Sequence, residues 1–299
     1  MALSNLSTSQ DERLAKLDVS TENAAEIRAI GQYRPISAEL AISSTVSVVI
    51  PARNEGANLP HVFPTLPAWV DEIILVDGNS TDDTVAVTRK FCPQAKVITQ
   101  TGRGKGDALC TGFAAATGDI IVTLDADGST DGGEIARFVG ALAAGADFTK
   151  GSRFTGSGGS DDITGVRRCG NRMLNVLVNR LFRTRFTDLC YGYNAFWAHH
   201  LAALQLDCTG FEIEALMNIR AAKIGLQIQE IPSHERPRIS GASNLNAFRD
   251  GWRVLNVIVR ERFRRSPKRA PRSLAATAPI PGLSTVLSET VDAAARDSA

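Results

Sequence analysis

The sequence lacks an excess of charge of either sign. Its 33 basic and 32 acidic residues nearly cancel, so no global field would attract a polyanion, and we expect no nucleic-acid partner. It also lacks any uninterrupted apolar run of about 18 residues, the length that a membrane-spanning helix needs. Residues 1–10 are polar, without the basic start and apolar run of a signal peptide. These absences predict a cytoplasmic protein, either free or peripheral at the inner face of the membrane.

Cysteine pairs at metal-ligand spacing are missing as well. The five cysteines form no CxxC motif, and none has a histidine nearby at such a spacing: Cys92, Cys110, Cys169, Cys190 and Cys208. We expect reduced thiols that behave as small buried apolar residues. None is a candidate site residue.

The composition changes twice along the chain. Residues 1–44 are mixed polar and charged and are predicted to form an N-terminal extension. Residues 45–265 are predicted to form one α/β domain, with a ligand-binding half at 45–150 and a second half at 151–265. Residues 266–299 are rich in Pro, Ala and Ser, which is typical of a disordered tail.

Short β-branched runs alternate with helical stretches in the first half of the domain. The runs lie at 46–50, 72–76, 95–98 and 119–124. This alternation is typical of parallel βαβ units and predicts a Rossmann-like, mostly parallel sheet with flanking helices. Each run ends at a loop of polar or small residues, and ligands bind at the carboxyl ends of parallel strands. Four candidate site loops therefore converge on one edge.

The second half is less regular. A Gly/Ser-rich loop is predicted at 151–161, a helix at 166–182 and a C-terminal amphipathic helix at 245–265. The last helix carries an apolar stripe at three- and four-residue spacing: Phe248, Trp252, Leu255, Val259 and Phe263. We expect this stripe to pack on the core. The arginines at its end favour an alternative, in which the helix rests on anionic lipid.

Two carboxylates, Asp125 and Asp127, directly follow the fourth run. Such a pair repels unless a cation lies between the groups, and hard oxygen ligands suit Mg²⁺ or Mn²⁺. A bound ion would neutralise a leaving diphosphate. Gly128 allows a tight turn, and Ser129 or Asp131 could add an oxygen ligand. The alternative is that both are ordinary turn-forming residues.

Two further loops carry polar candidates. Asp77 ends the second run and is placed to accept a hydrogen bond from a base or a ribose hydroxyl. The loop at 102–106 joins glycines to Arg103 and Lys105 before a helix, where a diphosphate could bind. It matches neither the P-loop nor the dinucleotide fingerprint, so a merely flexible loop is the alternative.

Taken in order, five segments resemble the family 2 glycosyltransferases with the GT-A fold. They are VVIPARNE at 48–55, DGNSTD at 77–82, GKGDAL at 104–109, DADGS at 125–129 and KGSRF at 150–154. The nearest subgroup by this resemblance is the dolichyl- or polyprenyl-phosphate mannose and glucose synthases. The resemblance spans about 45–245, and it assigns 45–150 to nucleotide-sugar binding and 151–265 to the acceptor side and the C-terminal helix.

The resemblance also implies roles for individual residues. Asp125 and Asp127 would bind the metal and the diphosphate, and Arg153 would contact the acceptor phosphate or the leaving diphosphate. The residues implied to bind the donor are Pro51, Arg53, Glu55, Asp77, Asn79, Lys105, Asp125 and Ala126.

Three later segments extend the resemblance: TDLCYGYNAF at 187–196, FEIE at 211–214 and RISGASNL at 238–245. Asn244 stands where the family usually has lysine, so one expected phosphate-binding cation is missing. Glu212 or Glu214 could orient a sugar hydroxyl or remove a proton, but an acidic first helical turn explains them equally well. The lone His234 is interpreted as structural.

The predicted reaction is transfer of a hexosyl unit from a nucleoside diphosphate sugar, GDP- or UDP-hexose, to an acceptor such as polyprenyl phosphate. The metal, held by Asp127, and Arg153 would stabilise the departing diphosphate. A lipid phosphate is already anionic and needs no base, whereas a hydroxyl acceptor requires a carboxylate such as Asp188 or Glu214. The resemblance implies inversion at the anomeric carbon.

Three alternatives stay open. The acceptor could be a soluble small molecule rather than a lipid. A nucleotidyltransferase would also use metal-binding carboxylates, but it would want a glycine- and basic-rich loop where this chain has 51–55. An inactive sugar-nucleotide-binding scaffold is the third, and the intact Asp125, Asp127 and Arg153 argue against it.

Overall fold

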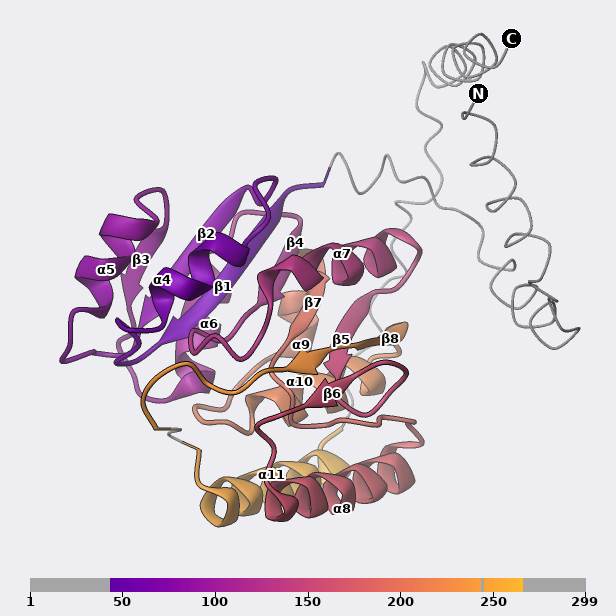
Figure 1. Ribbon diagram of the computed structural model, residues 1–299. Coiled ribbons are helices and arrows are strands. Elements are labelled where there is room, and N and C mark those ends of the chain that lie inside the picture. The colour runs from indigo at the N-terminus through magenta and orange to yellow at the C-terminus, as the bar shows by residue number, and fades with distance from the viewer. Residues whose placement is uncertain (1–43, 243–244, 266–299) are drawn as a thin grey trace, which may run out of the picture.

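The computed structural model describes residues 44–242 and 245–265, and its elements are labelled as in Figure 1. The expected tail at 266–299, Asn244 and all but the last residue of the expected extension lie outside the described residues. The strands, in chain order, are β1 (Val46–Ala52), β2 (Glu72–Asp77), β3 (Lys96–Thr99), β4 (Ile120–Thr123), β5 (Phe148–Ser152), β6 (Gly159–Ser160), β7 (Asn194–Trp197), β8 (Ile228–Pro232) and β9 (His234–Glu235).

A seven-stranded sheet with the order β3-β2-β1-β4-β7-β5-β8 forms the centre of the domain. The four runs predicted from the sequence are β1 to β4, and they pair in parallel, with Val49 of β1 opposite Ile74 and Thr123. Both faces of β1 and β2 are buried, which explains why these strands read as continuous apolar runs. The prediction of a mostly parallel sheet with flanking helices is confirmed.

The other three strands were not predicted. β7 runs antiparallel between β4 and β5, and β8 pairs in parallel with β5 at the sheet edge. Because β5 continues to Ser152, the predicted start of the Gly/Ser-rich loop at 151 is wrong. This half of the sheet uses short strands with buried polar residues such as Lys150 and Asn194, so its apolar signal is weak.

Helices cover both faces of the sheet. They are α4 (Leu59–Val62), α5 (Thr84–Phe91), α6 (Lys105–Ala115), α7 (Ile135–Ala143), α8 (Gly165–Phe182), α9 (Leu201–Leu204), α10 (Ile213–Lys223) and α11 (Ala247–Phe263), with the 3-10 turns η1 (Phe63–Thr65), η2 (Gly132–Glu134) and η3 (Ala198–His200). One core cluster joins α4 and α7 to one sheet face, and a second joins α6 and α10 to the other.

A third apolar cluster lies beyond α10, where α8 and α11 pack side by side as an outer layer (Figure 1). The predicted helix at 166–182 is confirmed as α8, and the predicted helix at 245–265 as the slightly shorter α11. Among the described helices, none is both long and apolar enough to cross a membrane.

The stripe on α11 does not pack on the core. Phe248 is 82% exposed, Trp252 64% and Phe263 82%, so the expectation of core packing is wrong. The helix instead buries Val254 and Ile258 against α8 and α10. Their positions are two residues out of step with the stripe, or about 200° around the helix, so α11 has apolar side chains on opposite sides.

All five cysteines are free in the structure, and they are not all buried. Cys92 and Cys208 are buried as expected, whereas Cys169 on α8 is exposed, and the expectation is wrong for that residue.

Candidate active site

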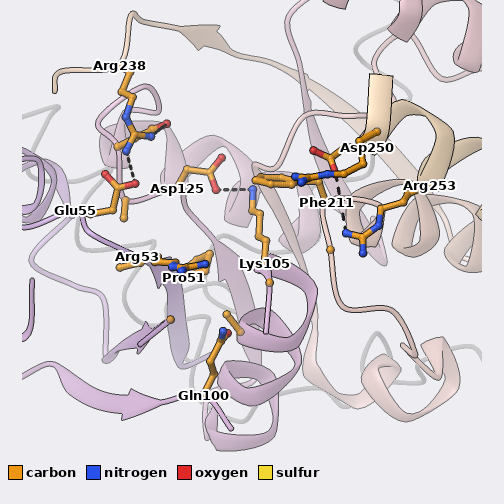
Figure 2. A pocket seen from close by; sticks show the side chains of 18 residues that line it. Pro51, Arg53, Glu55, Gln100, Lys105, Asp125, Phe211, Arg238, Asp250 and Arg253 are labelled. Atoms are coloured by element: carbon orange, nitrogen blue, oxygen red, sulfur yellow. Dashed lines mark hydrogen bonds and ion pairs between the residues drawn. The ribbon is translucent and has the colours of Figure 1, made fainter. Parts of the chain in front are cut away.

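A cavity of about 450 Å³ lies at the carboxyl ends of β1, β2 and β4, as the loop pattern predicted. Figure 2 shows its lining side chains. Those predicted from the sequence are Pro51, Arg53, Glu55, Lys105, Asp125, Ala126 and Asp127. The cavity therefore collects most of the residues that the resemblance assigned to the donor.

Lys105 lies in the middle of a short chain of charges, between Asp125 and Glu214. Lys105 Nζ is 2.6 Å from Asp125 Oδ1 and 2.7 Å from Glu214 Oε1 (Figure 2 marks the first contact). Burial alone would lower the pKa of Lys105, but the two carboxylates outweigh it and raise the pKa above its ordinary value. Burial raises the pKa of Glu214, while the positive charge of Lys105 acts to lower it. The lysine is therefore a fixed cation between two carboxylates.

Gly192 makes this arrangement sterically feasible. A Cβ at this position would lie 2.7 Å from Lys105 Nζ and 3.1 Å from Asp125 Oδ2. The absence of a side chain lets the three charged groups converge beneath the loop that precedes β7.

The glycines around Lys105 have a packing role. Gly104, at a φ of +92°, precedes α6, and a Cβ there would lie 2.3 Å from the Thr209 carbonyl oxygen. The backbone N–H groups of Gly106 and Asp107 donate to that same carbonyl at 2.9 and 3.3 Å. The first turn of α6 is therefore occupied by the chain itself, and the expectation that this helix start binds a diphosphate is not supported by the geometry.

Asp127 is held by a different cation. Arg238 Nη1 lies 3.1 Å from Asp127 Oδ2, and Arg238 Nη2 pairs with Glu55 (Figure 2). Burial raises the pKa of Glu55, opposed by hydrogen bonds from Arg238 and Asn58. Arg238 thus ties the loop after β9 to the loops after β1 and β4.

The donor set fits a divalent metal ion. Mg²⁺ and Mn²⁺ sites commonly use one or two carboxylates, with substrate phosphates and water supplying the other oxygens. Asp125 and Asp127 offer two carboxylates on one turn, both facing the cavity. Within 44–242 and 245–265 no group of three or more His, Cys, Asp and Glu residues is arranged as a metal site, so phosphates and water would complete the shell.

The two expected extra ligands differ. Ser129 lines a neighbouring cavity, but Asp131 accepts a hydrogen bond from Gly133 at 2.9 Å and pairs with Arg236 at 2.8 Å. Asp131 is thus engaged outside the site.

A second cavity, of about 480 Å³, adjoins the first. The two share six lining residues: Lys105, Asp125, Asp127, Phe211, Arg238 and Asp250. Beside its charged residues, the second cavity has apolar side chains from α8, α11, the segments just before these helices and the loop before β7: Ile163, Val166, Leu174, Tyr191, Leu245, Phe248 and Val254. The carboxylate turn therefore stands between a polar chamber and a more apolar one.

Arg153 lines the second cavity from a buried cluster. Its guanidinium bonds to both oxygens of Asp188, at 2.7 and 3.0 Å, and its Nη1 lies 3.0 Å from Glu235. Burial acts to raise the pKa of Asp188, but hydrogen bonds and charge from Arg153, with Lys150 nearby, hold it below its ordinary value. Asp188 is completely buried and lines neither cavity, so of the two candidate bases only Glu214 faces the site.

Asp77 and Asn79 also lie outside the cavity walls. Asp77 is buried at the end of β2 and accepts from the Ser80 N–H at 3.3 Å, while Asn79 is exposed. Their neighbour Gly78 does line the first cavity. Glu212 accepts from the Gly210 N–H, and the exposed His234 pairs with Asp161 at 2.9 Å, consistent with a structural role.

Sequence reasoning missed several lining residues. They are Gln100, Phe211, Arg238, Arg249, Asp250 and Arg253. Gln100 follows β3, and its Oε1 is buried without a hydrogen-bond partner among the described residues. The one sequence signal for Gln100 was its place after β3, whose carboxyl end lies at the same edge of the sheet as those of β1 and β2. Arg249, Asp250 and Arg253 of α11 reach the cavity only through tertiary packing.

The chain matches the model for glycosyl transferase family 2 over residues 47–205, more than half its length. It belongs to this family. The glycosyltransferase is 31% identical over 223 residues to an uncharacterized glycosyltransferase of Mycobacterium tuberculosis, covering 71% of this chain and 98% of the relative. It is 30% identical over 224 residues to the undecaprenyl-phosphate mannosyltransferase of Micrococcus luteus, covering 71% and 92%.

Among solved structures, the glycosyltransferase resembles glucosyl-3-phosphoglycerate synthase from Mycobacterium tuberculosis in complex with Mn²⁺, uridine diphosphate and glucosyl-3-phosphoglycerate. The TM-score is 0.59 at 25% identity, covering 75% of this chain and 82% of that one. The GT-A fold and a nucleotide-sugar-dependent glycosyltransferase activity follow from these likenesses, and the Mn²⁺ in the related structure supports the use of a divalent metal.

Proposed function

We propose that this glycosyltransferase moves a hexosyl unit from a nucleoside diphosphate hexose to polyprenyl phosphate, with inversion at the anomeric carbon. The observation that carries the proposal is the pair of cavities meeting at Asp125 and Asp127. A donor in the polar cavity would present its anomeric carbon to an acceptor in the apolar one. An attack from the opposite side of the departing diphosphate suits this two-chamber layout.

On the donor side, the chain supplies groups for each part of a nucleotide sugar. Arg53, Glu55 and the unpartnered Gln100 Oε1 surround the part of the cavity where a nucleobase would bind. Asp125 and Asp127 would hold Mg²⁺ or Mn²⁺, which supplies charge neutralisation for the leaving diphosphate when bound. Lys105 and Arg238 are the chain's own cations beside those carboxylates.

On the acceptor side, polyprenyl phosphate needs a site for its anionic phosphate and an apolar site for its prenyl chain. An acceptor phosphate oxygen forms the new bond to the anomeric carbon as the bond to the diphosphate breaks, and the nucleoside diphosphate leaves. A phosphate is already ionised at neutral pH, so no proton has to be removed. Arg238 faces this cavity, and the aliphatic and aromatic lining suits a prenyl chain better than a hydroxyl-rich metabolite.

Arg153 fits a positioning role better than direct charge neutralisation. Its charge is already matched by Asp188 and Glu235, so it offers a phosphate little net attraction. It lies under the Tyr191 ring, 4.9 Å from guanidinium carbon to ring centre, and so fixes one wall of the acceptor cavity.

A second candidate is transfer to a soluble phosphorylated acceptor. The fold similarity to glucosyl-3-phosphoglycerate synthase favours it, because a complex of that enzyme contains phosphoglyceric acid. Both acceptors carry an ionised phosphate monoester. They differ in whether an apolar tail follows and in whether a hydroxyl is present that would need a base to become the nucleophile.

The test is a donor and acceptor matrix. UDP- and GDP-hexoses with Mn²⁺ would be offered to undecaprenyl phosphate in detergent micelles and to phosphoglyceric acid, with product analysis by mass spectrometry. We expect hexosyl-phosphoryl-undecaprenol and free nucleoside diphosphate. Transfer to phosphoglyceric acid alone would select the second candidate. In a parallel assay, release of pyrophosphate from a nucleoside triphosphate and a hexose 1-phosphate, without transfer from the nucleotide sugars, would indicate a nucleotidyltransferase. Donor binding without any turnover would indicate a scaffold.

A further inference from the structure

Exposed apolar side chains gather on one layer of the molecule. Seven of the eleven exposed large apolar residues of the described chain lie on α8 and α11: Val166, Met173, Val176, Phe248, Trp252, Val259 and Phe263. The two helices lie side by side as the outermost layer (Figure 1). We call this surface the α8–α11 face. Apolar patches of this kind on a soluble protein mark sites that contact another surface.

The apolar residues of this face are not needed to hold the helices in place. α11 already packs through Val254, Val257 and Ile258 on its inner side. Phe248, Trp252 and Phe263 lie on the opposite side of the helix, where nothing described covers them. A helix that is apolar on both sides is typical of one covered from both sides.

The exposed charges on the two helices themselves all have one sign, and Arg260 pairs with Asp207 of a neighbouring loop at 2.9 Å. α8 contains no Asp or Glu, and its Arg168, Arg172 and Arg180 are exposed. On α11 the two acidic residues, Asp250 and Glu261, are buried, while the exposed ionisable side chains are arginines: Arg249, Arg253, Arg260 and Arg262. Aromatic and aliphatic groups mixed only with arginine complement a surface that is apolar and negatively charged.

The face is continuous with the second cavity. Val166 of α8 and Phe248 of α11 are both exposed on the face and both line that cavity. The apolar cavity therefore opens between the two helices, on the side where the apolar residues gather. A molecule reaching the cavity with an apolar tail would do so across this face.

We propose that the α8–α11 face docks on an anionic lipid bilayer, with its aromatic side chains among the acyl chains and its arginines at the phosphate headgroups. The opening of the acceptor cavity then faces the bilayer. The identity of the acceptor rests on the proposed function, but the docking surface itself does not. A bilayer is favoured over a protein partner because the charges surround the apolar stripe without any exposed acid on either helix.

The test compares the full chain with two double variants. Trp252→Gln/Phe263→Gln removes aromatics from the face at residues that line neither cavity. Trp69→Gln/Phe91→Gln removes two aromatics elsewhere that are each 48% exposed. Co-sedimentation would use vesicles of phosphatidylglycerol with phosphatidylcholine, and of phosphatidylcholine alone. We expect the wild-type chain and the Trp69/Phe91 variant to bind the anionic vesicles alike, and the Trp252/Phe263 variant at least about tenfold more weakly.

Further readouts separate this idea from its rivals. In a Trp69→Phe background, the emission that a further Trp252→Phe change removes, which separates Trp252 from Trp197, should shift to shorter wavelength on adding anionic vesicles. Failure to bind them, equal binding by the Trp252/Phe263 variant, or a dimer that this variant makes monomeric would overturn the proposal. Transfer to a short, water-soluble prenyl phosphate should be unchanged in the Trp252/Phe263 variant, so loss of docking and loss of the proposed activity are distinguishable.

Discussion

Two sets of ion pairs in this glycosyltransferase use the same chemistry in different surroundings. Arg153, Asp188 and Glu235 form a cluster that is almost fully buried. The pairs Lys105–Asp125 and Arg238–Asp127 have similar distances, but their carboxylates are about a quarter exposed and face both cavities. The ion pairs of the first set cannot exchange partners unless the surrounding structure unfolds. In the second set, Asp125 and Asp127 can leave their lysine and arginine partners and bind an incoming cation.

The buried set of ion pairs therefore has a structural role, and the partly exposed set has a role in ligand exchange. A buried pair is costly to break because one charge is left unpaired in a poorly polarisable interior. A pair beside a solvent-filled cavity costs little, because water replaces the lost partner. Substitutions in the buried cluster should therefore affect stability first, and substitutions at the carboxylate turn should affect catalysis first.

The largest expected effect is on stability. Asp188→Ala removes the main partner of Arg153 and also the acceptor for the Asn171 amide, which donates at 2.9 Å. We expect the free energy of unfolding to fall by about 3–5 kcal/mol. Urea unfolding followed by circular dichroism measures it. Asp125→Ala is the matched control, expected to change stability by about 1 kcal/mol or less; equal losses in both variants would erase the distinction.

The buried cluster should also set the acid stability. The pKa of Asp188 is lowered in the folded protein, so its contribution is present above the unfolded value of about 3.9 and is lost as the pH falls through the folded value. Urea midpoints measured from pH 6 down to pH 3 should fall less steeply in Asp188→Asn than in the wild type. A steeper fall in the variant would have the wrong sign.

The next effect is on turnover. Asp127→Asn keeps the shape of the turn, including the Ser129 N–H bond to Oδ1, but removes the charge that faces both cavities. We expect kcat/KM for hexosyl transfer to fall by about two to three orders of magnitude. Melting temperature should stay close to that of the wild type, since Arg238 keeps Glu55. Mn²⁺ titrations of the rate provide the measurement, and unchanged metal dependence would contradict the role.

The sequence predicted one half of the fold well and the other half poorly. The strands β1, β2 and β4 are buried on both faces, so their apolar runs were visible, and their polar ends marked the site. β7 has four residues and runs antiparallel between β4 and β5, a pairing that no local pattern identifies. On α11 the inner stripe contains the buried Asp250 and Glu261, whose polarity hid the packed side and made the outer stripe look like the core face.

The residues of the candidate site were likewise predicted only in part. Asp125 and Asp127 were predicted because they lie in the turn after β4, and Lys105 because it begins α6, and the structure brings the three together. The partners that hold them, Arg238 and Glu214, come from segments about a hundred residues away, so their pairing depends on the tertiary structure. Lone residues such as Gln100 carry no motif, so only the cavity reveals them.

A smaller effect is expected at the base candidate. Glu214→Gln leaves Lys105 to Asp125 alone, which should strengthen that pair at the expense of a metal ion. With a phosphate acceptor, we expect the apparent Mn²⁺ affinity and the rate to fall by about tenfold. A hydroxyl acceptor would need the carboxylate as a base, and kcat would then fall by about 10²–10⁴ with loss of the acidic limb of the pH profile. The pH dependence of kcat for both proteins decides between the two.

The smallest effect concerns which nucleobase the donor cavity prefers. Gln100 Oε1 is a buried acceptor beside the donor cavity, and uracil and guanine each carry a ring N–H that could donate to it, whereas adenine does not. Gln100→Leu should therefore raise the Kd of uridine or guanosine diphosphate by about five- to tenfold, roughly one hydrogen bond, and leave kcat unchanged. Calorimetry would compare these with adenosine diphosphate, whose affinity should not change. A uniform loss for all three nucleotides would mean that Gln100 only shapes the wall, and the site would then discriminate bases through Arg53 or Glu55 instead.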